Sequence, residues 1–313
     1  MKRFQNKAAE SRSTLPIAAL YGVVVWILAG LIQQLWWIQA VSYVIATFII
    51  IELNNSNALI RIYSRMVSAA FIFLSCAACF LFPSLPGAVF QLCIMASLYT
   101  LFKCYQDKTT TGLAFYTFML LGLGSLTHVQ AFYLAPVYWL LMAITIYSLS
   151  WRTFSASLLG LMLPYWFYTT WVIFLNDCDF TPLASHLEQL GHYTFPGNYL
   201  ALTLSQVLVF ALVTILSVTG MVHYFRTSSR DNIRIRQLFY SLIILNIFST
   251  LLLIVQPQHY DTMMRVMIIT ASPLIGHFIS LTRTRVTNIV FFVIITITVL
   301  LTAFNLWMLL LNS

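Results

Sequence analysis

The segment Ile289–Leu311, IVFFVIITITVLLTAFNLWMLLL, contains no charged residue and follows closely on Arg283 and Arg285. One crossing of the bilayer core takes about 20 predominantly apolar residues, so this segment is long enough to span it as a helix. Positive charge in short loops marks the cytoplasmic side, which places the start of the segment inside and its end outside. The same pattern of an apolar run beside a basic loop recurs along the chain and predicts the fold.

The composition also requires a membrane environment. Of the 313 residues 60% are hydrophobic and 8% are charged, whereas soluble domains carry about 25% charge. We predict an all-α, polytopic integral membrane helix bundle of about eleven transmembrane helices, which leaves about 28 residues per span (313 divided by eleven) and no room for a soluble domain. The predicted spans are Leu15–Ile32, Ile38–Ile51, Met66–Phe82, Ala88–Phe102, Leu113–Thr127, Phe132–Leu149, Phe154–Leu175, Tyr199–Met221, Leu238–Val255, Met263–Leu281 and Ile289–Leu311.

The basic residues set the orientation of these spans. Of the 16 Lys and Arg residues, all but Arg265 fall in loops on one side of the arrangement, and that side is expected to be the cytoplasm. We therefore predict a basic cytoplasmic N-terminus (1–14) and a single transmembrane domain (15–313). This domain has an external loop at 176–198, a basic cytoplasmic loop at 222–237 and an external C-terminus.

Two parts of this topology have alternatives. The first run resembles a signal peptide, but Gln33 and Gln34 after it do not form a small-residue cleavage site, so we expect a retained anchor. The runs 113–127 and 132–149 are joined only by residues 128–131, and a re-entrant hairpin there would preserve the orientation of everything downstream.

Arg265 is the one basic residue whose position the charge rule does not explain. Asp261 lies four residues before it, so the two can form an ion pair on one helix face. The alternative is an anionic ligand such as a lipid-linked phosphate, for which guanidinium geometry is suited. His259 and Trp171 are expected at the same outer face and complete this candidate ligand-binding set.

The external loop holds a second group of polar residues. Thr181 to Leu190 has leucines at helical spacing and predicts a short helix lying on the outer leaflet. His186, Glu188 and His192 in this loop are acid, base or metal-ligand candidates, but without a recognisable ligand spacing we interpret them as the wet face of the interfacial loop.

The sequence gives no pattern typical of a metal or cofactor site. Cys76 and Cys79 form a C-x-x-C inside a predicted span, which we interpret as apolar filler rather than a redox pair. No residue is assigned a catalytic role. The excess of basic over acidic residues is explained by the topology and by contact with anionic lipids, so nucleic acid is not an expected partner.

Two stretches carry a family resemblance: Ile51–Ala58 (IELNNSNA), continuing to Phe82-Pro83, and the region from Gln256-Pro257 to Ser272-Pro273-Leu274. Together with the order of apolar runs, they resemble an uncharacterised family of multi-spanning membrane proteins of Bacteroidota. The resemblance implies a bacterial inner (cytoplasmic) membrane and a place in the cell envelope, and it brings no catalytic residues. The Asn-rich signature is present as Asn54, Asn55 and Asn57, for which helix capping is the simplest interpretation.

Two functions remain open. The first is handling or transport of a lipid-linked or anionic envelope precursor, and the second is a non-catalytic membrane subunit or scaffold that docks a partner membrane protein. Polyprenol-dependent glycosyltransferases typically place an acidic residue in the first external loop, whereas residues Gln33–Trp37 contain none. This difference favours a protein that is not an enzyme.

Overall fold

A computed structural model describes residues 3–175, 180–191, 197 and 199–311, and in that part of the chain every regular element is a helix. The all-α prediction is therefore confirmed. Each of the eleven predicted apolar runs overlaps a helix, although the bounds differ: α2 (Thr14–Leu28), α3 (Trp37–Asn57), α4 (Met66–Ala77), α5 (Leu85–Lys103), α6 (Thr111–Thr127), α7 (Leu134–Ile144), α8 (Trp151–Leu175), α10 (Leu204–Thr227), α11 (Ile233–Val255), α12 (Tyr260–Leu281) and α13 (Arg285–Leu311).

The remaining elements are short. They are the helices α1 (Phe4–Glu10) and α9 (Thr181–Glu188) and the 3-10 turns η1 (Cys79–Leu81), η2 (Val129–Tyr133), η3 (Tyr199–Ala201), η4 (Ser228–Arg230) and η5 (Pro257–His259).

Not all of the eleven helices have the length of a crossing. Seven of the described helices, namely α3, α5, α8, α10, α11, α12 and α13, are long and apolar enough to span a membrane. The number rises to eight if α1 and α2, which meet at an angle of 89°, are counted as one broken span. The helices α4, α6 and α7 are shorter, with 12, 17 and 11 residues.

The predicted spans Met66–Phe82 and Phe132–Leu149 are not continuous helices, because backbone groups find partners outside a regular helix. The first breaks at Ala78 and continues as η1. The second ends at Ile144, after which the amides of Ser148 and Leu149 both donate to the Met142 carbonyl, at 3.0 and 3.1 Å.

The helix predicted in the external loop is present as α9. It begins at Thr181 and ends at Glu188, so it is shorter than the predicted segment to Leu190. Phe180 occupies the N-cap position, and Pro182 lies in the first turn, where its missing N–H costs no hydrogen bond.

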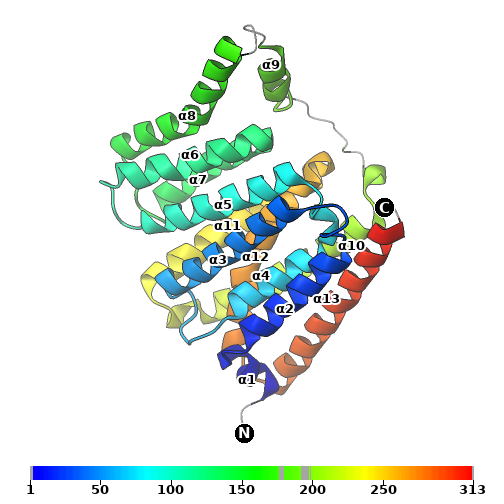
Figure 1. Ribbon diagram of the computed structural model, residues 1–313. Coiled ribbons are helices and arrows are strands. Elements are labelled where there is room, and N and C mark those ends of the chain that lie inside the picture. Colours follow the sequence, from blue (N-terminus) through cyan, green and yellow to red (C-terminus); the bar gives the residue numbers. More distant parts are fainter. Residues whose placement is uncertain (1–2, 176–179, 192–196, 198, 312–313) are drawn as a thin grey trace.

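The long helices run side by side through the molecule, with α8 and α9 at one edge and α1, α2 and α13 at the other (Figure 1). The helix α12 lies in the interior and packs against α4, α5, α10 and α11. At the first edge α6 packs between α5 and α8, and at the other α2 and α13 pack on α4. The helix α12 is the most enclosed of the spanning candidates.

Loops meet at two ends of the bundle. At one end, which we call the basic end, hydrogen bonds join Arg61 to Arg230, Arg234 to Asn57, Ser150 to Lys108 and Gln5 to Asn288. At the other, the opposite end, they join Gln39 to Pro83, Tyr133 to Leu190 and Tyr260 to Gln206. Each bond connects segments that the charge pattern assigns to the same side.

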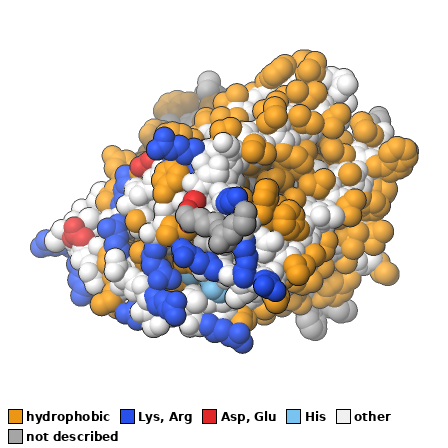
Figure 2. All heavy atoms as spheres, turned by 90° about the horizontal axis from the view of Figure 1, so that it is seen from below, with side chains coloured by type: hydrophobic (Ala, Val, Ile, Leu, Met, Phe, Trp, Pro, Cys, Tyr) orange, Lys and Arg blue, Asp and Glu red, His pale blue; other side chains and the backbone are white. Residues whose placement is uncertain are grey.

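The surface of the molecule has a charged part and an apolar part. Seen from below, Lys and Arg side chains gather on one side of the molecule, beside a broad hydrophobic surface (Figure 2). Large apolar side chains such as Phe48, Leu159, Trp166 and Leu300 are exposed on the helices. An apolar surface of this extent is unusual for a protein in water and is typical of contact with lipid.

Candidate functional site

Arg265 differs from every other Lys and Arg residue that the structure describes, because it alone is buried. It lies in the second turn of α12, close to the opposite end, and only 4% of its surface is exposed. The guanidinium stays charged at any ordinary pH, so its burial places a full positive charge inside the bundle. The charge rule had singled out this residue, and the structure gives it a singular environment.

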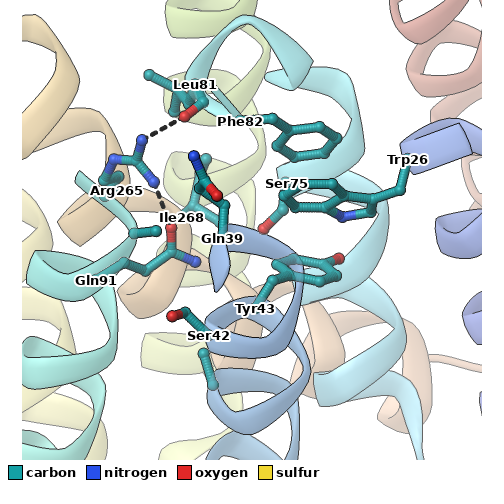
Figure 3. Close-up of a pocket in the computed structure, with 12 residues that line it drawn as sticks. Trp26, Gln39, Ser42, Tyr43, Ser75, Leu81, Phe82, Gln91, Arg265 and Ile268 are labelled. Atoms are coloured by element: carbon teal, nitrogen blue, oxygen red, sulfur yellow. Dashed lines mark hydrogen bonds between the residues drawn. The ribbon is translucent and has the colours of Figure 1, made fainter. Parts of the chain in front are cut away.

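The guanidinium is held by neutral groups. Its Nη1 donates to Gln91 Oε1 at 2.9 Å and its Nη2 donates to the Leu81 carbonyl at 2.5 Å (Figure 3). The Nε–H is buried and has no partner. Among the described residues, no carboxylate oxygen lies within the 4.0 Å that defines an ion pair with this group.

The predicted ion pair between Asp261 and Arg265 is therefore wrong. Asp261 is exposed in the first turn of α12, whereas the guanidinium donates to groups of α5 and η1 and meets the Asp261 charge only from beyond ion-pair distance. The physical reason is the space that Gly87 leaves: a Cβ at this residue would lie only 2.5 to 2.7 Å from three guanidinium atoms.

Groups with positive character lie close to the guanidinium, although the negative charge of Asp261 acts on it from beyond ion-pair distance. Gly87 is in the first turn of α5, which Ser84 caps by accepting the Gly87 N–H at 3.0 Å. The positive end of a helix dipole does not compensate a cation. In the loop after α6, burial of the His128 ring, together with the nearby charges of Arg265 and His186, lowers the pKa of His128 to about 4.

A small cavity adjoins the guanidinium, and we call it the Arg265 cavity. Its volume is about 20 Å³, which is room for one water-sized atom group. The polar side chains that line it with Arg265 are Gln39, Ser42, Ser75 and Gln91, and one wall is aromatic: Trp26 stacks on Phe82 at 3.9 Å between ring centroids, beside Tyr43. Figure 3 shows these side chains converging from α2, α3, α4 and α5.

The other predicted site residues do not line this cavity. His259 is buried at the start of α12, with its ring 6.0 Å from that of Tyr133. Trp171 is half exposed on α8 and contacts Tyr168. The structure therefore does not assemble Asp261, His259 and Trp171 around Arg265.

The three candidate residues of the loop 176–198, namely His186, Glu188 and His192, do not share one environment. His186 Nε2 lies 2.8 Å from the Ser125 carbonyl and is half-buried, so one face of α9 docks on the end of α6. Glu188 is exposed, as the interpretation of a wet face requires. His192 lies outside the described residues.

Sequence reasoning missed the residues that hold the guanidinium. Gln91 is a polar residue inside the apolar run Ala88–Phe102, and this could have marked it as a partner for a buried charge. No sequence signal could have identified the Leu81 carbonyl, which is freed where α4 gives way to η1.

A second set of charged side chains lies at the basic end. Asp231 has a fully buried side chain, and Arg61 Nε lies 2.7 Å from its Oδ1. His277 Nε2 lies 3.3 Å from Asp231 Oδ2, and the ring of His223 is 5.6 Å from that of His277. This cluster fastens the loop before α11 to α12 and to the loop after α3.

The Asn-rich signature contributes to the same fastening. Asn54 Nδ2 donates to the Ser64 carbonyl at 3.4 Å, and Asn57 Oδ1 accepts from Arg234 at 3.0 Å. The helix α3 ends at Asn57, and the left-handed backbone of the C-cap residue Ala58 closes the last turn. Asn57 Nδ2 also donates to the Leu53 carbonyl in the last turn of α3 at 3.0 Å. Helix capping alone is therefore an incomplete interpretation, because Asn54 and Asn57 also tie α3 to other segments.

The cysteines and the other side chains that can bind metals are the groups from which a metal site would be built. Cys76 and Cys79 are free and fully buried. No group of three His, Cys, Asp or Glu residues within the described ranges is placed to hold a metal ion.

No protein-family model, curated protein or solved structure matches this chain.

Proposed function

We propose that this chain is a polytopic protein of the bacterial cytoplasmic membrane that binds the anionic group of a lipid-linked envelope precursor at the Arg265 cavity. In the proposed topology the eleven apolar segments all reach across the bilayer, with the short α4, α6 and α7 completed by their flanking turns. The basic end lies in the cytoplasm with the N-terminus, and the C-terminus lies outside. The grouping of loop contacts at two ends supports this arrangement, as does the clustering of Lys and Arg.

The observation that carries the proposal is a buried guanidinium that forms no ion pair with a described residue and meets the negative charge of Asp261 only from beyond ion-pair distance. Removing a charge from water costs several kcal/mol even after the protein relaxes, and neutral partners repay only part of this. Gln91 and Leu81 satisfy two of the five N–H groups of Arg265, and Nε–H is left unpaired. An anionic oxygen would supply both the missing charge and the missing acceptor.

The size of the cavity restricts how an anion binds. A volume of about 20 Å³ admits one oxygen and not a whole phosphate. The rest of the group must then lie on the side of Gln39, which is half-buried, lines the cavity and donates to the Pro83 carbonyl at 3.3 Å. A monophosphate ester on a membrane-borne chain fits these limits, because its terminal oxygens project from the lipid.

The test is binding of a lipid monophosphate to the full chain in phosphatidylcholine nanodiscs. Undecaprenyl monophosphate is the probe and undecaprenol is the uncharged comparison, both measured by native mass spectrometry. Wild type should prefer the phosphate, and Arg265→Gln should weaken its binding about tenfold or more, as expected for a hydrogen bond to a charged group. Arg265→Lys should also bind less, because an ammonium cannot reproduce the guanidinium fork.

The matched control is Arg226→Gln, which removes an exposed arginine and should leave binding unchanged. Equal binding of undecaprenol and its phosphate by wild type would refute the proposal. That result would favour the alternative, a non-catalytic subunit in which Arg265 only fastens α12 to α5.

A further inference from the structure

A larger cavity lies at the opposite end, and we call it the polar cavity. Its volume is about 640 Å³, within the range of small-molecule sites. It is open on one side and is lined by four segments: the connection between α2 and α3, residues 80–83, the start of α10 and the end of α13. The positive φ of Gly30, +106°, turns the first of these segments over the cavity.

The polar lining has a consistent chemistry. It consists of side-chain amides and hydroxyls, and none of the described residues that line the cavity carries a charge. Its polar members are Gln33, Gln34, Thr203, Ser205 and Asn305, and Trp36 and Phe80 add aromatic rings. Amides and hydroxyls both donate and accept hydrogen bonds. Together with aromatic faces, they suit a neutral group with many hydroxyls, such as a sugar ring.

Asn305 provides this cavity with a fixed hydrogen-bond acceptor. Only 1% of its surface is exposed, and its Nδ2 donates to the Ala77 carbonyl at 2.6 Å. That bond fixes the orientation of the amide, since a carbonyl can only accept. The Oδ1 atom is then left buried without a partner. A buried unpaired acceptor is costly, and a hydroxyl group in the cavity would satisfy it.

The polar cavity also has an apolar wall, and it lies beside the Arg265 cavity. Met308 and Leu309, from the last turns of α13, line it and offer a path for a hydrocarbon chain. Phe80 and Pro83 line the polar cavity, while Leu81 and Phe82 line the Arg265 cavity. Residues 80–83 are therefore a shared wall between a neutral site and a cationic one.

We infer that the polar cavity binds a neutral glycosyl headgroup carried on a lipid, with Asn305 accepting a hydrogen bond from a sugar hydroxyl. This inference extends the proposed function, because it names the chemical class of the group that accompanies the anion. It does not depend on the charge of Arg265, since the two cavities have separate lining residues.

The test uses a lipid that has the sugar and lacks the phosphate. Monoglucosyl diacylglycerol and diacylglycerol are titrated into phosphatidylcholine nanodiscs that contain the full chain, and bound lipid is counted by native mass spectrometry. Wild type should retain the glucosyl lipid preferentially. Asn305→Leu should weaken this binding about three- to tenfold, which is the effect of one hydrogen bond.

Binding of the glucosyl lipid is also measured for three further variants. A double change of Gln33 and Gln34 to Ala alters only exposed side chains, so it should reduce binding without disturbing the fold. Gln189→Ala, on the same end but outside the cavity, should bind as wild type does. Arg265→Gln should also keep the glucosyl lipid, so failure of this inference and failure of the phosphate site are distinguishable.

Three outcomes would overturn the inference. These are no preference of wild type for the glucosyl lipid, unchanged binding in both cavity variants, and competition by free methyl glucoside at the same concentration as the lipid. The last would show that the site takes a soluble sugar and that the lipid chain contributes nothing.

Discussion

Replacing Gly87 by Ala should displace Arg265 without changing any charged or polar side chain. The new methyl group would lie 2.5 to 2.7 Å from the guanidinium, well inside van der Waals contact, and the flexible arginine must move. Moving it breaks at least one of the bonds to Gln91 and Leu81. A hydrogen bond to a charged group is worth about 1.5–3 kcal/mol, and Ala in a helix returns up to about 1 kcal/mol relative to Gly. The expected net loss is about 1–2 kcal/mol.

The assay is unfolding in mixed detergent micelles with increasing dodecyl sulfate, followed by circular dichroism, together with binding of undecaprenyl monophosphate. Gly112→Ala is the matched control, because this glycine is also in the first turn of a helix and a Cβ there meets nothing within 4 Å. It should be neutral or slightly stabilising. If Gly87→Ala unfolds at the same midpoint as Gly112→Ala and binds the phosphate as tightly, then the position of the guanidinium matters for neither stability nor binding.

Three further predictions concern topology, the basic end and pH. In a background without native cysteines, a cysteine at Gly191 should react with an impermeant maleimide in intact cells and one at Ser229 only after permeabilisation; the reverse pattern would exclude the proposed orientation. Asp231→Asn should lower the free energy of unfolding by about 2 kcal/mol, because a buried carboxylate that pairs with a partly exposed arginine is lost. Glu188→Gln, at an exposed residue of α9, should leave unfolding unchanged, and equal midpoints for the two variants would refute a fastening role for the cluster. The pKa of His128 is about 4 in the folded protein and about 6.5 when unfolded, so the unfolded chain takes up a proton as pH falls through that window and stability falls with it. Between pH 7.5 and 5 wild type should lose about 1 kcal/mol more than His128→Gln, after allowance for the partial exposure of the ring, and equal losses would contradict this.

Apolar periodicity and charge were sufficient to predict helices at all eleven runs, because each helix must hide its backbone polar groups in any apolar medium. They did not predict where those helices stop. The run Met66–Phe82 is uniformly apolar, and nothing in it marks the break at Ala78. That break frees the Leu81 carbonyl for an arginine about 180 residues later, and such long-range partners leave no local trace.

The candidate site shows the same limit. Spacing along one helix predicted the Asp261–Arg265 pair, but spacing does not reveal which side of a helix has room. Gly87, in another helix, decides that side. The sequence marks Arg265 as exceptional through topology alone, and its actual partners follow from packing.

The enclosure of α12 has a consequence for how the protein is assembled. Taken alone, this helix is a poor membrane segment, because a buried arginine near one end and a histidine near the other would have to sit in lipid. Its polar groups find partners in η1 and α5, which are synthesised long before it, and in Asp231, in the loop before α11. By contrast α13 has no charged residue after its first position and can enter lipid unaided. It follows that α12 joins the bilayer by docking on helices already in place, and that a truncated chain lacking α4 and α5 would fail to retain it.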